Sequence, residues 1–558
     1  MANVFLSEVH RGYRHPFLYG VHYLGGVGGG HPATLLADLA MSTLSFEIRR
    51  SDNWWKDFRK EDFREKWTDA ALRRAWHVRA PSLTSEVLLS RKQKRPHQVQ
   101  YVLDELEGYC TLRDEKGKCQ VSCFDRVWES DILLDWRATQ DLKELLGKFK
   151  SSALRSEDGT VSYLLDHMSY PLVYNRTLVS GLNGKTLRPI APLFNDLLTV
   201  SPHFALLPSD VSVSSGSAIE FLSYINNLHP DFHHGIYQHL ESLLAGFIPL
   251  FENTLTDLHR NNPSMQRIPG NCRYTIWEEP EPPEHSDDEE GWITYESDMR
   301  NWALNRPIDL PDIPDTGYPG GLETRRHVVS LRNRKIQVIT AAFEISLHPQ
   351  GPTFDGTPWH VEGTRSERIV ACGFHCLSAE NITQSRLSFR MAVTYPRGFA
   401  AGDTGATLRT WGIRDGDSCH QYVGEVPIRQ GLSLTFPNIY QHQYSSFSLE
   451  DQSRDGHLVG IWFFLVDPEI KPIVSTAAVG PQQESWIRCA LYDSLRTRLP
   501  TELIENILDN VDGLMTPKEA EDYRRQLVEA IEQFTQANNS YHFCIPFDIW
   551  NGPDTMPS

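Results

Sequence analysis

The chain has 558 residues, of which 40% are hydrophobic and 23% charged, a composition typical of a globular protein with two or three lobes. Its formal net charge of −18 argues against binding to nucleic acid or to an anionic membrane surface, because both need a basic face. The sequence has no signal peptide, no apolar run long enough to span a membrane and no paired cysteine motif, so we expect a cytoplasmic protein.

Residues 1–275 are predicted to form a mainly helical N-terminal region. The strongest helical signal lies between Ser215 and Arg260, where apolar residues recur at the spacing of one helix face. This stripe consists of Ile236, Leu240, Leu243, Leu244, Phe247 and Phe251. Pro249 is expected to kink or end the helix, since its ring removes a backbone donor. The pattern indicates a core helix.

Residues 276–325 are acidic and rich in proline. The stretch from Glu278 to Glu290 reads EEPEPPEHSDDEE and holds eight acidic residues and three prolines. A block of like charges repels itself and stays solvated. The segment is therefore predicted to be a linker or loop.

Residues 326–480 are rich in short β-prone runs that are separated by Gly, Pro, Asn and Asp. The runs cover residues 335–347, 368–375, 387–393, 432–436 and 458–466. Many short strands with turns between them favour a sandwich or barrel over a parallel α/β sheet. We therefore predict an α+β fold whose core, residues 326–480, is a cupin-like jelly roll, also called a double-stranded β-helix.

The C-terminal part, residues 481–558, returns to a helical pattern and is predicted to pack on the core. Thr516, Pro517 and Glu519 have the types and the order of a capped helix start. A helix beginning there would place its apolar residues on one face.

One short motif in the β-rich region carries candidate metal ligands. His360-Val361-Glu362 follows a turn sequence, and in a strand residues i and i+2 point to the same face. His442 lies at the end of another β-prone run. Two histidines and one carboxylate on adjacent strands form the facial triad of mononuclear non-haem iron. We therefore predict His360, Glu362 and His442 as metal ligands and catalytic centre; the same ligand types could also hold zinc for hydrolysis.

Other side chains are candidates to surround this centre. His375 falls on the strand that follows the motif and is a candidate to face the site. Asn438, Tyr440 and Gln441 are close enough to His442 in sequence to orient the ligands by hydrogen bonds, which metal sites regularly use.

Longer motifs resemble a known family over most of the chain. Ser223–Pro230 reads SYINNLHP, Trp359–Gly363 reads WHVEG and Phe464–Pro468 reads FLVDP. These motifs resemble the fungal uncharacterised family named domain of unknown function 4246, which is similar to iron(II)/2-oxoglutarate-dependent oxygenases. The resemblance implies Fe(II) at the H-x-E…H residues, 2-oxoglutarate as a candidate cosubstrate, and O2 with a small-molecule substrate. The family's substrates are largely unassigned, so the resemblance implies a chemistry and no substrate.

One position departs from the family pattern. Members commonly have Gly-His-Arg-Lys before the FLVDP strand, whereas this chain has Gly456-His457-Leu458-Val459. Enzymes of this kind hold the far carboxylate of 2-oxoglutarate with an Arg or Lys, and the planar fork of Arg suits that role. Leu458 has no such group. Arg454, Arg386 and Arg390 are the candidates to replace it in cosubstrate binding; otherwise the chain does not use 2-oxoglutarate.

The sequence therefore predicts an iron-dependent oxygenase or oxidase that acts on a small molecule, with neither nucleic acid nor membrane as partner. Three alternatives stay open: an iron enzyme without 2-oxoglutarate, a metal-dependent hydrolase or lyase, and a binding protein with a degenerate barrel. The sequence does not predict the substrate, the reaction outcome or the oligomeric state.

Overall fold

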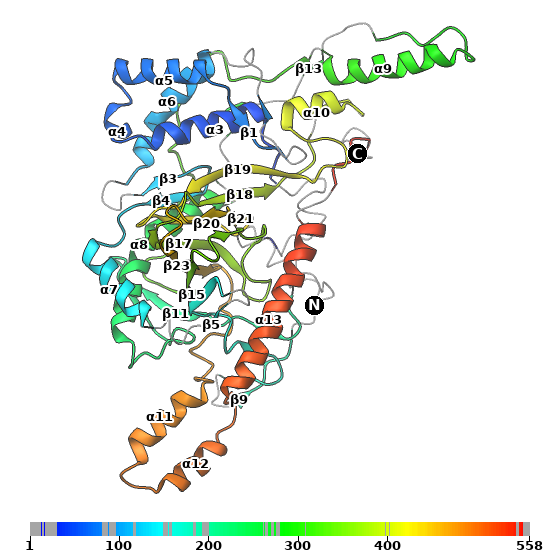
Figure 1. Cartoon of the computed structure of the whole chain (residues 1–558). Helices are drawn as coiled ribbons and strands as arrows, with labels where there is room; N and C mark the ends of the chain where they lie inside the picture. Colours follow the sequence, from blue (N-terminus) through cyan, green and yellow to red (C-terminus); the bar gives the residue numbers. More distant parts are fainter. Residues whose placement is uncertain are drawn as a thin grey trace.

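The computed structural model (Figure 1) describes most of the chain as a mixed structure of helices and antiparallel sheets. The described residues are 13, 16, 31–80, 87–88, 96–114, 119–148, 154–155, 159–181, 186–191, 200–259, 262, 266–268, 273–274, 279–306, 308–396, 398–400, 402–542 and 546–550. Arg260 and Glu278, which bound two predicted segments, lie outside these residues. Among the described helices, none is long and apolar enough to cross a membrane.

The larger sheet is antiparallel and has ten strands. Its main path is β12 (Ile219–Phe221), β11 (Ser209–Val213), β15 (Arg334–Leu347), β23 (Gly456–Val466), β17 (Ile369–Glu380), β20 (Ser433–Pro437), β4 (Trp128–Ser130) and β3 (Gln120–Val121). Two further strands, β6 (Val161–Leu165) and β5 (Leu154–Arg155), join it through β15. Nearly all of β23 is buried, as expected for a strand covered on both faces.

A smaller antiparallel sheet faces the larger one. It consists of β19 (His420–Pro427), β18 (Arg386–Ala392) and β21 (Tyr440–Tyr444), and an isolated bridge between His360 and His442 extends it. Phe389 of this sheet lies 4.9 Å from Phe436 of the larger sheet, measured between ring centroids. The space between the two sheets is thus filled by side chains of both.

Short two-stranded sheets lie around these two layers. They pair β16 (Thr353–Phe354) with β22 (Phe447–Ser448), β7 (Leu172–Val173) with β10 (Phe204–Ala205), β8 (Val179–Ser180) with β9 (Thr186–Leu187), β1 (His77–Val78) with β2 (Val87–Leu88), and β13 (Arg273–Tyr274) with β14 (Ile308–Asp309).

Helix α8 (His234–Leu258) covers the outer face of the larger sheet. The predicted apolar stripe is buried against that sheet, and a Cβ at Gly373 of β17 would lie 2.9 Å from the ring of Phe251. The hydroxyls of Thr254 and Thr435 are 2.8 Å apart across the same contact. Pro249 does not end the helix, which continues to Leu258. The prediction of a core helix is confirmed.

The N-terminal region is less purely helical than predicted. Its helices are α3 (Leu36–Arg49), α4 (Trp54–Asp57), α5 (Glu61–Arg73), α6 (Pro96–Leu112), α7 (Trp136–Gly147) and α8. Buried Arg267 ties two of them together by ion pairs of 2.9 Å to Asp38 of α3 and 2.7 Å to Glu105 of α6. The region also supplies strands β3, β4, β6, β11 and β12 to the larger sheet, which sequence periodicity did not reveal because these strands have five residues or fewer.

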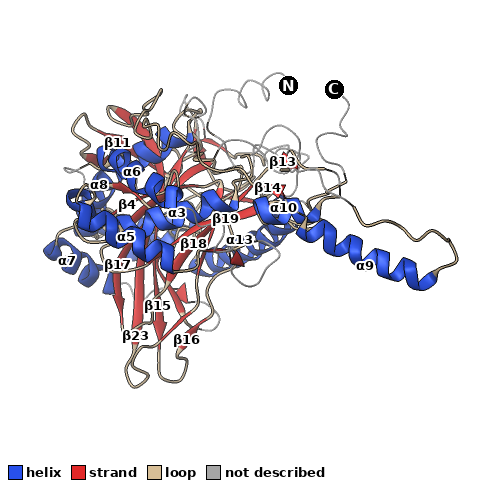
Figure 2. Cartoon of the chain, turned by 90° about the horizontal axis from the view of Figure 1, so that it is seen from above, coloured by secondary structure: helices blue, strands red, loops and turns tan. Residues whose placement is uncertain are grey.

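The acidic segment contains a helix where a linker or loop was predicted. Helix α9 (Glu289–Asn305) begins at Asp288, whose carboxylate accepts a hydrogen bond of 2.9 Å from the N–H of Gly291. Glu289 and Glu290 lie in its first turn, where the helix dipole favours negative charge. Figure 2 shows α9 extending away from the rest of the described structure. It buries none of its residues, and the shorter helix α10 (Thr404–Trp411) contacts it.

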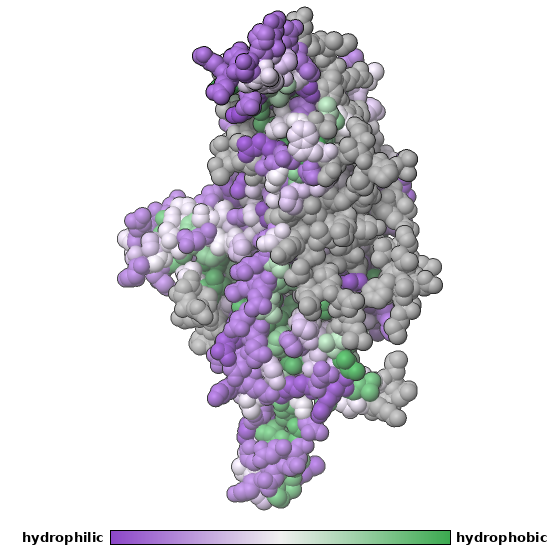
Figure 3. All heavy atoms as spheres, turned by 90° about the vertical axis from the view of Figure 1, so that its right-hand side faces the viewer, coloured by the Kyte–Doolittle hydropathy of each residue, from purple (hydrophilic) through white to green (hydrophobic). Residues whose placement is uncertain are grey.

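The C-terminal segment contains α11 (Glu484–Leu495), α12 (Thr501–Asp509), α13 (Pro517–Ala537) and a π-helical turn η2 (Asn538–His542). Thr516 caps α13 by accepting a hydrogen bond of 3.3 Å from the N–H of Glu519. Figure 3 shows that the side of the molecule on which α13 lies is largely hydrophilic where it is coloured. The opposite, apolar face of α13 therefore packs inward, with Leu527 buried.

The stability of this fold should fall as the pH drops, because folding buries a neutral histidine between α8 and the larger sheet. The ring of His375 accepts or donates a 2.9 Å hydrogen bond with Ser433, and burial lowers its pKa from 6.5 to about 4. A histidine with a lowered pKa binds fewer protons when folded, so its contribution is complete above pH 6.5 and is lost toward pH 4. The full loss is roughly 3 kcal/mol. We expect His375→Gln to make the unfolding free energy, measured by denaturant titration, less dependent on pH over this range. His285→Gln, at an exposed position, should leave this pH dependence unchanged.

Candidate metal centre

The predicted ligands come together at one edge of the smaller sheet. His360 and His442 exchange two backbone hydrogen bonds, of 3.2 and 3.0 Å, which bring the H-x-E segment beside β21. The turn before it needs glycine: Gly356 has φ +89°, and a Cβ there would lie 2.5 Å from the carbonyl oxygen of Tyr444. This turn therefore fixes where His360 enters the sheet.

The three side chains converge on one point. Oε1 of Glu362 lies 3.5 Å from Nε2 of His360 and 3.3 Å from Nε2 of His442. The two imidazole rings are 4.2 Å apart between centroids. One ligand atom from each residue lies within 4.8 Å of the others, as binding of a single metal ion requires.

The electrostatics of the three groups suit a cation. Burial opposes ionisation of Glu362, but the two imidazoles bond to it and hold its pKa well below its usual range. Burial, with the charge of His360, lowers the pKa of His442 to about 4, so this ring is neutral near pH 7. Nε2 of His442 faces Oε1 of Glu362 at 3.3 Å, and its Nδ1 has no hydrogen-bond partner among the described residues. A buried lone pair without a donor is what a metal ion would satisfy.

His360 is oriented by its own loop. Its Nδ1 lies 2.8 Å from the carbonyl oxygen of Pro358, to which it donates a proton, so Nε2 keeps its lone pair toward Glu362. Burial lowers the pKa of His360, but the hydrogen bond that the protonated Nε2 donates to Glu362, together with the charge of that carboxylate, outweighs burial and raises the pKa overall. The fixed tautomer is the one that metal binding through Nε2 needs.

The side chain of Asn438 holds the backbone of Glu362 by hydrogen bonds. Its side-chain oxygen accepts a bond of 2.9 Å from the N–H of Glu362, and its amide nitrogen donates to the carbonyls of Glu362 (2.8 Å) and Ile369 (3.0 Å). Asn438 is fully buried. Of the three outer residues predicted from the sequence, Asn438 meets the metal-ligating segment, whereas Tyr440 donates to Asp125 and Gln441 to Asn539.

Aromatic rings surround His442 between the two sheets. Its ring centroid lies 4.9 Å from that of Phe436 and 5.4 Å from that of Trp462. Trp462 in turn contacts Phe374 at 4.9 Å, and Phe374 contacts Tyr444 at 5.8 Å. The centre therefore borders a packed apolar interior, which excludes water on that side.

His167 is a neighbour that sequence analysis missed. It lies in the loop after β6, and the charge of Glu362 acts on its pKa, which burial lowers overall. Its ring is 5.6 Å from Phe464, which stacks on Trp462 at 5.6 Å. No signal in the sequence indicated it, because a lone histidine in a loop far from the motif has no pattern.

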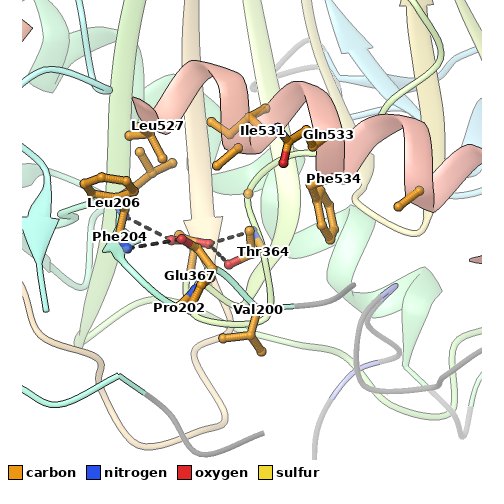
Figure 4. A pocket seen from close by; sticks show the side chains of 14 residues that line it. Val200, Pro202, Phe204, Leu206, Thr364, Glu367, Leu527, Ile531, Gln533 and Phe534 are labelled. Carbon is orange, nitrogen blue, oxygen red and sulfur yellow. Dashed lines mark hydrogen bonds between the residues drawn. The ribbon is translucent and has the colours of Figure 1, made fainter. Parts of the chain in front are cut away.

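A cavity lies under α13 (Figure 4). Its volume is about 190 Å³, and we call it the α13 cavity. Its walls include Phe204, Leu206, Gly363, Leu527, Ile531 and Phe534. Gly363 follows the ligand Glu362 directly, and Phe534 packs on Val361 between the two ligands of the motif. The carboxylate of Glu367 at its floor is satisfied by the N–H groups of Leu206 (2.9 Å) and Thr364 (2.5 Å).

The structure does not bring Arg386 and Arg454, which were predicted to bind the cosubstrate, to the metal centre. Arg386 pairs with Glu425 at 2.8 Å on the surface, and Arg454 pairs with Asp451 at 2.9 Å in an exposed turn. Both guanidinium groups are thus held by carboxylates at exposed positions.

Two other predicted residues, Arg390 and His375, are buried, but their side chains point away from the metal centre. Arg390 follows Phe389 on β18 and so faces the opposite side, where its Nε donates to Gln441 (2.6 Å) and its guanidinium covers Trp359. His375 alternates with inward-facing Phe374 and meets Ser433 instead. Sequence alone could not decide these faces, because the register of a strand fixes which residues point inward.

Comparison with known proteins identifies a family whose model matches most of this chain. The family model described as "Protein of unknown function (DUF4246)" matches residues 96–490, and no curated protein matches significantly. Among solved structures the chain is similar to a bsmA homolog from Methylobium petroleophilum PM1 (8% identity, TM-score 0.22, 60% of this chain and 86% of that one). It is also similar to AviO1 from Streptomyces viridochromogenes Tue57 (12%, 0.21, 63% and 93%) and to the Fe(II)/(alpha)ketoglutarate-dependent dioxygenase TqaL (10%, 0.20, 60% and 90%). TM-scores this low do not establish a common fold or function.

Removal of either histidine should abolish metal binding. We expect His360→Ala and His442→Ala to lose iron(II) in equilibrium dialysis followed by metal analysis, because two ligands do not hold the ion that three hold. His348→Ala, which removes an exposed histidine paired with Asp455, is the control and should bind iron like the wild type. Wild-type iron affinity in both ligand variants would show that the triad is not a metal site.

Asn438 should strengthen iron(II) binding without being a metal ligand itself. Asn438→Ala leaves the N–H and C=O of Glu362 unpaired, so we expect iron(II) to bind about 10–100-fold more weakly. Asn510→Ala removes an exposed side chain that donates to Asn506 and should change nothing. Thermal unfolding of both variants separates loss of affinity from loss of fold. An unchanged iron affinity in folded Asn438→Ala would contradict this role.

Proposed function

Since this chain belongs to the DUF4246 family, whose function is unknown, we propose from the chemistry of its centre that it is a mononuclear non-haem iron oxygenase or oxidase acting on a small molecule. The observation that carries the proposal is the convergence of His360, Glu362 and His442. Two imidazoles and one carboxylate leave coordination positions free for O2 and for a substrate.

The proposal includes the fold, which we infer to be a double-stranded β-helix. The strand order β15–β23–β17–β20 in one sheet, and the His360 segment–β21–β18–β19 in the other, supports it. In this arrangement the triad lies at one mouth of the barrel formed by residues 326–480, between its two walls.

The residues present fit iron(II). His442 offers a neutral imidazole whose Nε2 faces Glu362, His360 offers Nε2, and Glu362 is held ionised. When bound, iron(II) would supply the redox chemistry with O2. The chain itself orients the carboxylate through Asn438 and keeps water from the inner side through Phe436 and Trp462.

The residues do not fit 2-oxoglutarate held by the usual clamp inside the barrel. Leu458 is fully buried and shares the inward face of β23 with Trp462. A carboxylate there would be desolvated without a partner. Arg386, Arg390 and Arg454 are engaged elsewhere. We therefore favour the version in which the substrate, and no clamped 2-oxoglutarate, supplies the electrons that reduce oxygen.

A second candidate function is a hydrolase or lyase, because the same donor set also suits zinc. The two are separated by the metal that the protein carries after purification without oxygen. Iron with O2 uptake supports the proposal. Zinc, together with iron-loaded protein that consumes no O2, would support the hydrolase.

Addition of 2-oxoglutarate to the iron(II)-loaded protein should leave its visible spectrum unchanged. We expect anaerobic iron(II) to bind but no saturable charge-transfer band of a chelate to form, because the barrel lacks the cation at Leu458. Leu458→Arg is the matched variant, and there the band should appear. A saturating band in the wild type would show that another group holds the cosubstrate and would contradict the version without it.

A further inference from the structure

Helix α13 and the turn η2 lie against the outer side of the segment that carries two of the metal ligands. Neighbouring residues of an extended segment point to opposite sides, so Trp359 and Val361 face outward while His360 and Glu362 face the metal centre. Phe534 of α13 packs on the buried side chain of Val361. The C-terminal helix therefore supports the metal-binding motif from the side opposite to the metal.

One side chain of η2 bonds the residue that precedes each histidine ligand. Nδ2 of Asn539 donates a hydrogen bond of 2.8 Å to the carbonyl oxygen of Trp359, which precedes His360. Oδ1 of Asn539 accepts a hydrogen bond of 2.6 Å from Nε2 of Gln441, which precedes His442. A single amide thus connects the two segments that carry the imidazoles.

The segment 359–362 depends on side chains to hold it in place. Its described backbone–backbone bonds are the two that His360 exchanges with His442. The last residue of the segment is held by the side chain of Asn438, and the first is held by the side chain of Asn539. Because side-chain amides hold both ends, loss of either one should let the ligands move relative to each other.

We infer that Asn539 is a positioning residue of the metal centre, which sets the spacing of the two histidine ligands, and that iron(II) binding and the docking of α13 strengthen each other. This inference rests on the proposed iron site. The coupling is reciprocal, because an ion that binds the docked state more tightly also stabilises that state. Asn539 lies outside residues 96–490, which match the family model, so the family does not supply this role.

Asn539→Asp separates positioning from stability. The new carboxylate keeps an acceptor for Gln441 and gains an ion pair with Arg390, whose Nη2 lies 3.2 Å from Oδ1 of Asn539, but it cannot donate to Trp359. We expect a melting temperature close to that of the wild type and iron(II) affinity about 10–100-fold weaker in anaerobic titration. Gln536→Glu adds the same charge at an exposed position of α13 and should bind iron(II) like the wild type.

Hydrogen exchange of the full-length protein tests the coupling without a substitution. Iron(II), added to the wild type without oxygen, should slow exchange of the amides of residues 517–542, because their local opening then requires loss of the contacts that hold the ligands. The amides of α12 serve as the internal reference and should exchange at an unchanged rate. In Asn539→Asp saturated with iron(II), the slowing over 517–542 should be smaller than in the wild type.

Iron(II) titration of the wild type comes first, and a wild type that binds no iron overturns the proposed function itself. If iron binds, wild-type affinity in folded Asn539→Asp, or an equal loss of affinity in Gln536→Glu, overturns this inference alone. Exchange over 517–542 that iron(II) leaves unchanged, or slows no more than exchange of α12, also overturns it. The exchange measurement on the wild type decides the question even if Asn539→Asp does not fold.

Discussion

The backbone bridge between His360 and His442 is the constraint on which the rest of the site depends. It joins a short segment after a glycine turn to a strand far along the chain, and it sets two imidazoles 4.2 Å apart with a carboxylate between them. Asn438 fixes the second half of the motif by bonding both backbone groups of Glu362. Strand β18 pairs with β21 in the smaller sheet, and β17 pairs with β20 in the larger sheet, which α8 covers. Backbone pairing thus sets the positions of the metal ligands, and the three side chains determine the chemistry of the centre.

Burial of these groups would be unfavourable in a protein that binds nothing. His442 is neutral, its Nδ1 has no hydrogen-bond partner among the described residues, and its Nε2 faces the ionised Glu362. A buried charge needs a partner of opposite sign, and a divalent cation satisfies the carboxylate and both lone pairs at once. A metal ion would therefore complete the buried electrostatic network of these three side chains.

Part of this account could be predicted from the sequence. The period-two spacing of His360 and Glu362 places both on one face, and short β-prone runs placed His442 on a nearby strand; the structure brings the three together. The capped start of α13 followed from Thr516, Pro517 and Glu519. These features are local, so a few neighbouring residues determine them.

Features that depend on strand register or long-range contact could not be predicted. The inward or outward direction of Arg390 follows from the pairing of β18 with β21, which no local pattern encodes. His167 reaches the surroundings of Glu362 from a loop. The acidic charge run around α9 favoured a linker, but Asp288 provides a helix cap there. Tertiary context decided the first two cases, and a local cap decided the third.

The most direct test of the central claim is anaerobic exposure of the iron(II)-loaded protein to nitric oxide, followed by electron paramagnetic resonance. Nitric oxide binds ferrous iron only where a coordination position is free, so a three-ligand centre predicts a high-spin iron–nitrosyl signal equivalent to one iron per chain. The His442→Ala protein treated in the same way should give no such signal. Iron that binds without forming the nitrosyl species, or an undiminished signal in His442→Ala, would contradict the account of His360, Glu362 and His442 as an open iron site.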